Sequence, residues 1–234
     1  MSQLIYEGKA KKVFTSDTPD QYILYFKDDA TAFNAQKKDV IEGKGVLNQK
    51  IATQIFQYLI KHQIPTHFVA SISDREMKVD AVQIIPVEVI IRNITAGSLC
   101  KRLGIKEGIT LKEPLVEFCY KNDALGDPLM IEEHIYILEL ATKEDIALIK
   151  KQSLRINELL QKMFLELGIV LADFKLEFGK NKKGEIVLAD EITPDGCRLW
   201  DKETGKILDK DRFRKDLGGL AEAYTEVLER LSKF

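Results

Sequence analysis

The sequence predicts an α+β fold of two lobes, each built on antiparallel strands. Residues 1–85 consist mainly of short apolar runs separated by turn residues, which is the pattern of paired strands. From residue 86 onward, strand patterns alternate with longer segments in which apolar residues recur at helical spacing. We therefore expect a strand-rich lobe over 1–85 and a mixed α/β lobe over 86–234, with no internal repeat or low-complexity linker.

The composition is that of a globular chain with a sizeable core. Hydrophobic residues make up 45% of the 234 residues, and the formal net charge of −2 disfavours a nucleic-acid binder that relies on general electrostatics. The three cysteines, Cys100, Cys119 and Cys197, are spaced for neither a disulfide framework nor a zinc site. The start of the chain lacks a signal-peptide pattern, and no apolar run approaches the length of a membrane span. We expect a cytoplasmic protein that binds neither nucleic acid nor membrane.

The first lobe contains strand patterns, one helix pattern and one irregular segment. Residues 28–45 are polar and irregular, so we expect a long loop there. The helix has an apolar stripe at helical spacing and is ended by Pro65. The strands are expected at Leu4–Glu7, Ala10–Phe14, Tyr22–Phe26, His67–Ser71 and Met77–Val79, and the helix at Val46–His62.

The second lobe begins with the nearly continuous apolar run Gln83–Ile91, which predicts a strand buried on both faces. Thr142 followed by Asp145 predicts a helix cap, and the apolar series after it sustains a helix to Gly168. Further elements are expected as strand and loop over 112–127 and as helices over 209–217 and 220–231.

The segment from Ile169 to Asp201 carries an unusual pattern of charges. Period-two alternation places Asp173, Lys175 and Glu177 on one face of a strand, with large apolar residues on the other face. After a glycine-bounded turn, a second apolar run ends in Asp190. Several carboxylates around one lysine suit a hard cation and phosphate, whereas the alternative is a solvated sheet face.

A loop is expected to follow this hairpin over 192–201. Its Pro194-Asp195-Gly196 sequence is a turn signal, and Arg198 comes two residues later. A rigid turn that presents an arginine beside carboxylates is suited to holding an anionic substrate near a metal.

Two other segments carry groups that suit phosphate. Small residues between Arg92 and Ser98 open a short helix, and backbone N–H groups at a helix start suit a phosphate monoester; the alternative is an ordinary helix cap. Near the start, Gly8 allows a tight turn beside three lysines, although such a hairpin is also typical of solvated surface. Neither G-x-G-x-x-G nor a Walker A motif is present.

Four segments, in order over nearly the whole chain, resemble the SAICAR synthetase family in its bacterial monofunctional form: YEGKAKKV, PVEVIIRNITAGSLCKRLG, DFKLEFG and DEITPDGCRLWDKETG. The resemblance implies an ATP cleft between the two lobes, similar to an ATP-grasp or kinase arrangement. It also implies an ATP-dependent ligase that joins L-aspartate to 5-amino-1-(5-phosphoribosyl)imidazole-4-carboxylate, giving SAICAR, ADP and phosphate in de novo purine biosynthesis. ATP and Mg²⁺ are the cofactors implied.

The resemblance also implies residue roles. The loop at 28–45 borders the active site, with Asp29, Lys44 and Gly45 as lining residues, and the adenine slot lies beside 82–85. Nucleotide binding falls to Gly8, Lys9, Ala10, Lys11, Lys12 and Lys121; substrate binding to Arg92, Ser98, Asp195 and Arg198; catalysis to Lys175, Asp195 and Arg198; and metal binding to Glu177 and Asp190.

The register of the hairpin leaves the metal assignment open. A hairpin centred near Lys182 places Asp190 close to Asp173 rather than to Glu177, so a bulge or strong twist is needed, or Asp173 shares the metal role.

Two rival functions also stay open. A small-molecule kinase would use the same charged groups without aspartate, and a non-catalytic nucleotide sensor would show no turnover. A homodimer, the kinetic order, the aspartate-binding residues and a discrete acyl phosphate are left undecided by the sequence.

Overall fold

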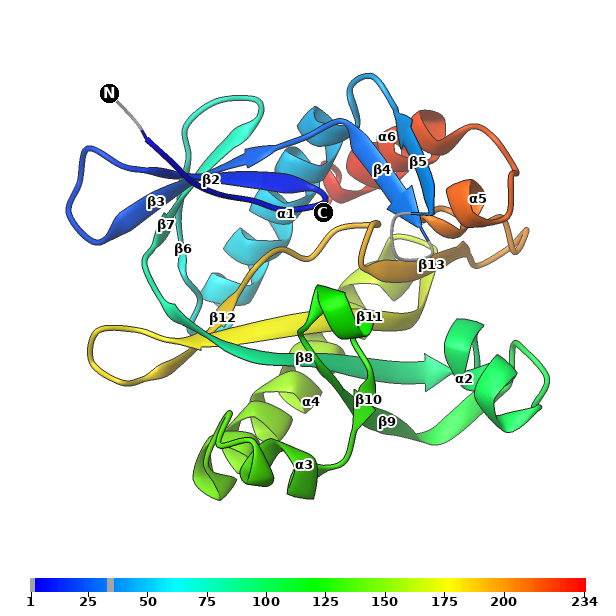
Figure 1. The fold of residues 1–234 in the computed structure, drawn as a ribbon. Helices are drawn as coiled ribbons and strands as arrows, with labels where there is room; N and C mark the ends of the chain where they lie inside the picture. The colour runs from blue at the N-terminus through cyan, green and yellow to red at the C-terminus, as the bar shows by residue number, and fades with distance from the viewer. Residues whose placement is uncertain (1–2, 33–35) are drawn as a thin grey trace.

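The computed structural model describes residues 3–32 and 36–234, and its two larger sheets, both antiparallel, lie one above the other in Figure 1. The upper sheet has five strands in the order β1-β2-β3-β7-β6, all from the first eighty residues. Its strands are β1 (Leu4–Glu7), β2 (Lys11–Thr15), β3 (Gln21–Phe26), β6 (Phe68–Ser71) and β7 (Glu76–Asp80).

The lower sheet forms the second layer, in the order β10-β9-β8-β11-β12, with β13 also paired to β11. Every strand pair in it is antiparallel. Its strands are β8 (Gln83–Ile94), β9 (Thr110–Tyr120), β10 (Leu129–Met130), β11 (Ile169–Lys180), β12 (Ile186–Ala189) and β13 (Cys197–Asp201). These two sheets confirm the expected α+β fold.

The chain passes from one sheet to the other between Asp80 and Gln83, close to the boundary expected near residue 85. We propose lobes of 1–85 and 86–234 on this basis. The apolar core is nevertheless continuous, because residues of both sheets belong to one buried cluster.

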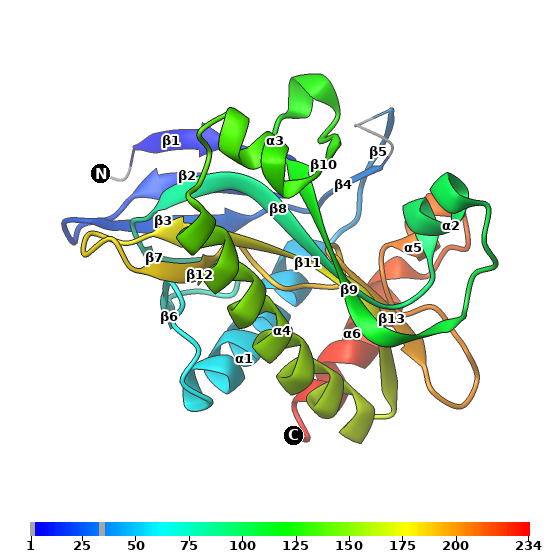
Figure 2. The ribbon, with the colours of Figure 1, turned by 90° about the horizontal axis from the view of Figure 1, so that it is seen from below.

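Helices cover the outer faces of the sheets. Helix α1 (Lys44–Lys61) packs on β3, β6 and β7 and against α6 (Leu220–Leu231), while α4 (Lys143–Glu166) packs along β11 and β8, as Figure 2 shows from below. The capping box expected for α4 is confirmed, because Thr142 and Asp145 exchange side-chain to backbone hydrogen bonds of 3.1 Å. The shorter helices are α2 (Gly97–Leu103), α3 (Glu132–Ile137), α5 (Asp211–Arg214) and the single 3₁₀ turn η1 (Asp123–Leu125). In the part of the chain that the structure describes, no helix is both long and apolar enough to cross a membrane.

Three expectations about elements were wrong. The segment 28–45 contains a two-stranded sheet of β4 (Asp29–Ala32) and β5 (Lys37–Val40), whose short, charged strands have no sequence signal of their own. The expected loop 192–201 ends in strand β13, which is stabilised by pairing with β11 far away in the sequence. The helix expected over 209–217 is limited to α5.

The hairpin register was also wrong. Glu177 pairs with Ala189, so Asp190 directly follows the partner of Glu177 without any bulge between β11 and β12. The expected alternation is confirmed, since the apolar face of β11 is buried in the core, with Phe174, Leu176 and Phe178 at most 1% exposed.

Candidate active site

Along one edge of β11 the pairing strand changes from β13 to β12, and the site lies where this change occurs. The first half of that edge pairs with β13 up to Phe174, and the second half pairs with β12 from Glu177 onward. Between these points the β12–β13 connection approaches the strand, and the Lys175 backbone N–H donates to the Gly196 carbonyl at 3.0 Å. Lys175 therefore lies where the hairpin and the 190–196 loop meet.

The Lys175 side chain is surrounded by carboxylates from three segments. Its Nζ lies 2.9 Å from Glu88 Oε1, 2.5 Å from Glu177 Oε1 and 3.4 Å from Asp190 Oδ2. Glu177 is only 2% exposed and also accepts from Lys121 Nζ at 2.8 Å. Glu88 is opposite Glu177 on the neighbouring strand β8, and no sequence pattern identified it.

Charge determines the protonation of this cluster. Burial alone would lower the pKa of Lys175, but the charges of Glu177, Asp190 and Glu88 outweigh it and raise that pKa well above its usual value. Burial would raise the pKa of Asp190, yet the charges of Lys11, Lys175 and Lys121 hold that pKa below its usual range. Lys175 is therefore an ammonium ion and Asp190 a carboxylate ion at neutral pH, and Lys175 is no proton acceptor there.

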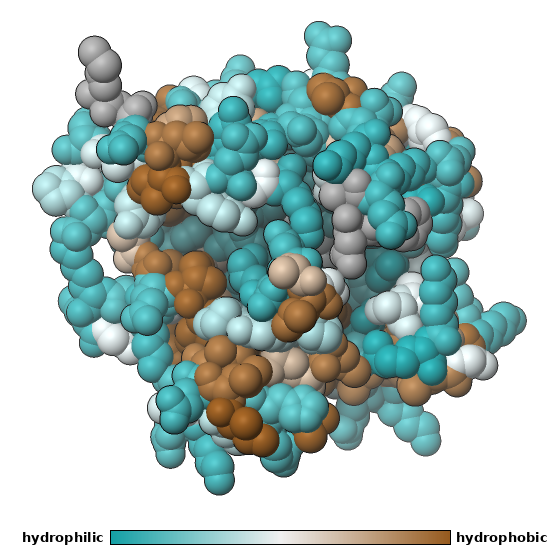
Figure 3. Space-filling model, in the orientation of Figure 1, coloured by the Kyte–Doolittle hydropathy of each residue, from teal (hydrophilic) through white to brown (hydrophobic). Residues whose placement is uncertain are grey.

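A cleft of about 650 Å³ between the two sheets contains this cluster. Figure 3 shows a mostly hydrophilic hollow between the two halves. Val82, Ile84 and Pro86 form part of an apolar wall on one side, at the place where the adenine slot is expected. The roof includes Gly8, Lys9, Ala10 and Lys11 of the first hairpin, and the floor includes Glu88, Lys121, Lys175, Glu177, Asp190 and Glu191.

The lysines of the first hairpin differ in their contacts. Lys9 Nζ lies 2.7 Å from Asp123 across the mouth of the cleft, and Lys11 pairs with Asp190 and Glu191 inside it. Lys12 is not among the residues that line the cleft; its Nζ lies 3.7 Å from Glu7. The structure thus brings all the expected nucleotide residues together except Lys12.

The donor chemistry of the cleft fits Mg²⁺ that is shared with a phosphate ligand. Among the described residues, no group of three or more potential ligands is arranged to hold a metal by itself. Magnesium usually takes one or two protein carboxylates together with phosphate oxygens and waters. Glu177 and Asp190, which both line the cleft, supply such a pair.

A second cluster extends from the other end of the polar face of β11 as an alternating series of charges. Asp173, 4% exposed, accepts from Arg92 Nη1 at 2.9 Å and from Arg198 Nη1 at 2.8 Å. Arg92 also donates from Nε to Glu117 at 2.6 Å and from Nη2 to the Ser98 hydroxyl at 3.0 Å. Each carboxylate in this series lies between two arginines, and the series as a whole is Arg102, Glu117, Arg92, Asp173, Arg198, Asp211 and Arg214.

Gly97 is required for the position of Arg198. It has a φ of +54°, and a Cβ at this position would overlap the Arg198 guanidinium. The guanidinium therefore packs directly against the backbone at the start of α2, beside the exposed Ser98. Arg92, Ser98 and Arg198 lie together, as expected from the sequence.

Asp195 lies in a separate buried network. Its carboxylate accepts from Lys44 Nζ at 2.5 Å, Asn48 Nδ2 at 2.9 Å and the Tyr224 hydroxyl at 2.7 Å. Lys44 is 0% exposed. Burial would raise the pKa of Asp195, but the charges of Lys44 and Lys210 outweigh it and hold that pKa well below its usual value. The network ties the 190–196 loop to α1 and α6.

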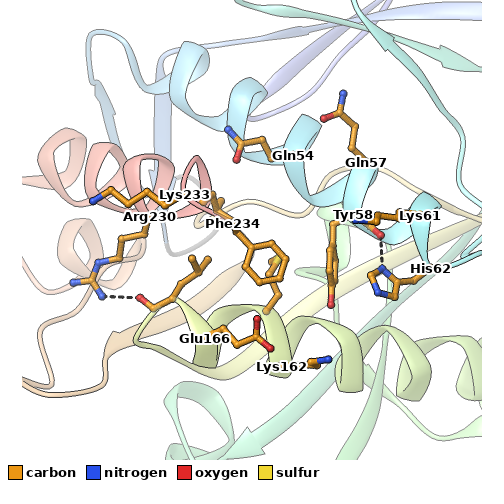
Figure 4. Close-up of a pocket in the computed structure, with 13 residues that line it drawn as sticks. Gln54, Gln57, Tyr58, Lys61, His62, Lys162, Glu166, Arg230, Lys233 and Phe234 are labelled. Atoms are coloured by element: carbon orange, nitrogen blue, oxygen red, sulfur yellow. Dashed lines mark hydrogen bonds between the residues drawn. The ribbon is translucent and has the colours of Figure 1, made fainter.

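A larger hollow lies elsewhere, in a groove of about 1080 Å³ where α1, α4 and the end of the chain converge. Figure 4 shows the Tyr58 and Phe234 rings side by side there, with Lys61, Lys162 and Glu166 around them. We place the site in the cleft because the groove contains one acidic side chain and no cluster of opposed charges.

Comparisons with known proteins cover the whole chain. The family model described as SAICAR synthetase matches residues 4–231. A phosphoribosylaminoimidazole-succinocarboxamide synthase from Caldanaerobacter subterraneus subsp. tengcongensis is 60% identical over 99% of this chain and 98% of its own length.

Solved structures agree with this match. A phosphoribosylaminoimidazole-succinocarboxamide synthase from Ehrlichia chaffeensis has a TM-score of 0.97 at 46% identity, over 99% of both chains. A SAICAR synthetase in complex with ADP has a TM-score of 0.95 at 48% identity, over 98% of this chain and 97% of that one. The similarity therefore includes both lobes and the cleft between them.

The Asp195 network generates a prediction about stability and pH. Asp195→Asn leaves Lys44 buried without an anionic partner, and removing one member of a buried ion pair costs about 3–5 kcal/mol. The variant should therefore melt at a lower temperature than the parent protein at pH 7. Because the folded-state pKa of Asp195 is depressed, its contribution is present above the unfolded-state value near 3.8 and is lost as the pH falls through the folded-state value. Thermal unfolding of both proteins should therefore show a smaller difference in Tm between the parent protein and Asp195→Asn at pH 3 than at pH 7. An equal difference at the two pH values would contradict this account.

Proposed function

This chain belongs to the SAICAR synthetase family, and on that premise we propose that it uses ATP to join L-aspartate to 5-amino-1-(5-phosphoribosyl)imidazole-4-carboxylate. The products are SAICAR, ADP and phosphate, in de novo purine biosynthesis. The observation that carries the proposal is the position of Lys175 on β11, between a carboxylate-rich cleft and an arginine-rich cluster.

The two ends of the polar face of β11 suit two different substrates, the ribotide and the nucleotide. Asp173 and Glu177 are four residues apart on one face, which is about 13 Å along a strand. We assign the arginine end, with Arg92, Ser98 and Arg198, to the phosphate of the ribotide. Glu177 and Asp190 mark the nucleotide end, and the ribotide carboxylate would lie near Lys175 between them.

The nucleotide assignment rests on the cleft and on a relative. The apolar wall at 82–86 suits adenine, and the hairpin residues Gly8, Lys9, Ala10 and Lys11 suit the phosphates, with Lys121 below them. The SAICAR synthetase structure that is 48% identical to this chain was solved in complex with ADP. Lys12 stays a prediction with less support, because it does not line the cleft.

The chemistry needs an activated carboxylate. The ribotide carboxylate oxygen attacks the γ-phosphorus of ATP, the bond to the β–γ bridging oxygen breaks and ADP leaves. The aspartate amine then attacks the acyl carbon, inorganic phosphate leaves and the amine gives up a proton as the amide forms. Negative charge on the transferring phosphoryl group must be offset throughout.

Lys175 is suited to that task. Its raised pKa keeps the ammonium charged, so it stabilises phosphoryl and acyl oxygens by charge rather than by proton transfer. Mg²⁺, when held by Glu177, Asp190 and the nucleotide phosphates, would supply further positive charge. Asp195 already accepts three hydrogen bonds, so we propose that it orients Lys44 and the loop rather than contacting substrate directly.

Arg198 has a different position from Asp195. Its Nε donates to Asp211 at 3.1 Å and its Nη1 donates to Asp173, which leaves Nη2 beside Gly97 and the exposed Ser98. We propose that Nη2 binds substrate.

A cytoplasmic location is proposed on the three free thiols, Cys100, Cys119 and Cys197, and a homodimer stays a prediction.

The proposed reaction is tested by measuring ADP release from ATP and the ribotide, with and without L-aspartate. Sustained ADP release should require both co-substrates, and SAICAR should appear in equal amount by mass spectrometry. ADP release that continues without aspartate, with a phosphorylated product, would support the small-molecule kinase instead. Nucleotide binding without turnover would support the sensor.

Lys175→Met should lower kcat by about 10²-fold or more, because it removes a preorganised charge that acts on the transition state. ADP binding should persist, since Lys9, Lys11 and Lys121 remain in the cleft. Lys180→Met is the matched control, because Lys180 is on the same strand but pairs with Asp145 outside the cleft. Turnover of the Lys175 variant within a few-fold of the Lys180 variant would contradict the assignment.

Arg92→Lys should raise the KM for the ribotide while leaving the KM for ATP nearly unchanged. A lysine cannot reproduce the planar fork that reaches Glu117, Asp173 and Ser98 at once. Loss of one charge-assisted hydrogen bond, worth about 1.5–3 kcal/mol, corresponds to roughly a tenfold or greater change. Lys9→Met should instead raise the KM for ATP and leave the KM for the ribotide nearly unchanged. If either variant changed both KM values equally, the assignment of the two ends of the site to different substrates would be contradicted.

A further inference from the structure

Asp190 has a backbone conformation that its sequence does not favour. Its φ is +58°, in the left-handed region that non-glycine residues rarely occupy. This turn ends β12 and directs the carboxylate into the cleft, where it pairs with Lys11 and with Lys175. Something outside the residue must hold the turn, since such conformations persist only where their surroundings fix them.

His67 contacts the turn directly. Its Nε2 lies 3.0 Å from the Asp190 backbone oxygen. Because a carbonyl oxygen only accepts, the imidazole must donate from Nε2. The ring is 3% exposed and packs at 5.5 Å, tilted, against the Phe56 ring of α1. A buried ring that is packed on one face and hydrogen-bonded at one edge has little freedom to move.

The backbone of His67 also joins the two sheets. Its N–H donates to the Leu188 carbonyl in β12 at 2.9 Å, and its carbonyl accepts from the Asp80 N–H at the end of β7 at 2.7 Å. The adjacent Thr66 forms an isolated parallel bridge with the same Leu188. His67 is thus connected to the upper sheet, to β12 and to the residue that follows β12.

We propose that His67 is a positioning residue, which holds the left-handed turn at Asp190 and so fixes the carboxylate that shares Mg²⁺ with the nucleotide. The metal role of Asp190 belongs to the proposed function, and the inference rests on it. His67 precedes Asp190 by more than a hundred residues, so no local sequence pattern indicates the contact. A residue that orients a metal ligand typically affects metal affinity or activity by about 10–100-fold when it is replaced.

The test compares two amides at this position. Gln places its Nε2 at nearly the same distance from the backbone as His Nε2, whereas Asn is one methylene shorter and cannot reach Asp190. His67→Gln should bind ADP with a Mg²⁺ dependence close to that of the parent protein. His67→Asn should require about tenfold more Mg²⁺ for the same ADP binding, measured by calorimetry at a series of Mg²⁺ concentrations.

Two controls separate positioning from general loss of structure. His67→Asn should bind ADP as tightly as the parent protein when Mg²⁺ is absent. A variant with a disrupted cleft would bind ADP more weakly under that condition as well. His62→Ala removes a similar contact, in which Nδ1 lies 2.8 Å from the Tyr58 carbonyl at the end of α1, in the groove of Figure 4 and outside the cleft; it should leave the Mg²⁺ dependence unaltered.

Equal Mg²⁺ dependence of the Gln and Asn variants would overturn the proposal, whether both match the parent protein or both are weakened. Because the measurement is nucleotide binding, a parent protein that binds ADP with Mg²⁺ but forms no amide would count against the proposed reaction alone.

Discussion

The structure depends on the neutralisation of charge along one face of β11. Asp173 and Glu177 are 4% and 2% exposed, and Lys175 lies between them. An ionised side chain that is buried without a partner costs several kcal/mol, so Asp173 and Glu177 require oppositely charged neighbours, and the partly exposed ammonium of Lys175 has such neighbours as well. Those neighbours come from β8, from the end of β9 and from the loop after β12. The charge cluster on β11 therefore forms only where these segments of the lower sheet come together.

The change of partner along the edge of β11 explains why the site lies at the middle of the strand. A continuous neighbouring strand would cover the Lys175 backbone with a regular ladder. Here β13 ends its pairing at Phe174 and β12 begins at Glu177, which leaves room for the 190–196 loop to contact Lys175 through Gly196. The loop is in turn held by Asp195 against Lys44 and Tyr224. The loop is thus fixed from both sides, by β11 through Gly196 and by α1 and α6 through Asp195.

Local sequence rules predicted what is decided locally. Period two indicated the two faces of β11, and Thr142 with Asp145 indicated the start of α4. These rules did not predict strand pairing: β13 depends on β11, which is not its neighbour in the sequence, and the β4–β5 pair and the hairpin register depend on where each strand begins and ends, which a period-two pattern does not fix. Glu88 was missed because a single acidic residue in an apolar strand indicates no function by itself. Its role becomes visible only when β8 pairs with β11 and Glu88 lies opposite Glu177. The residue roles themselves came from the resemblance to a family, not from periodicity.

The balance of charge in the cleft links the structure to the proposed need for Mg²⁺. Four carboxylates, Glu88, Glu177, Asp190 and Glu191, face three ammonium groups, Lys11, Lys121 and Lys175, so this part of the cleft is close to neutral with a small negative excess. A nucleotide triphosphate adds several negative charges to that surface. The lysines cannot offset them without leaving their carboxylates unpaired, at a cost that burial makes large. Mg²⁺ held by Glu177 and Asp190 together with the nucleotide would meet both demands, since it would offset the repulsion between these carboxylates and the phosphates and would leave the charge of Lys175 to act on the transferring group.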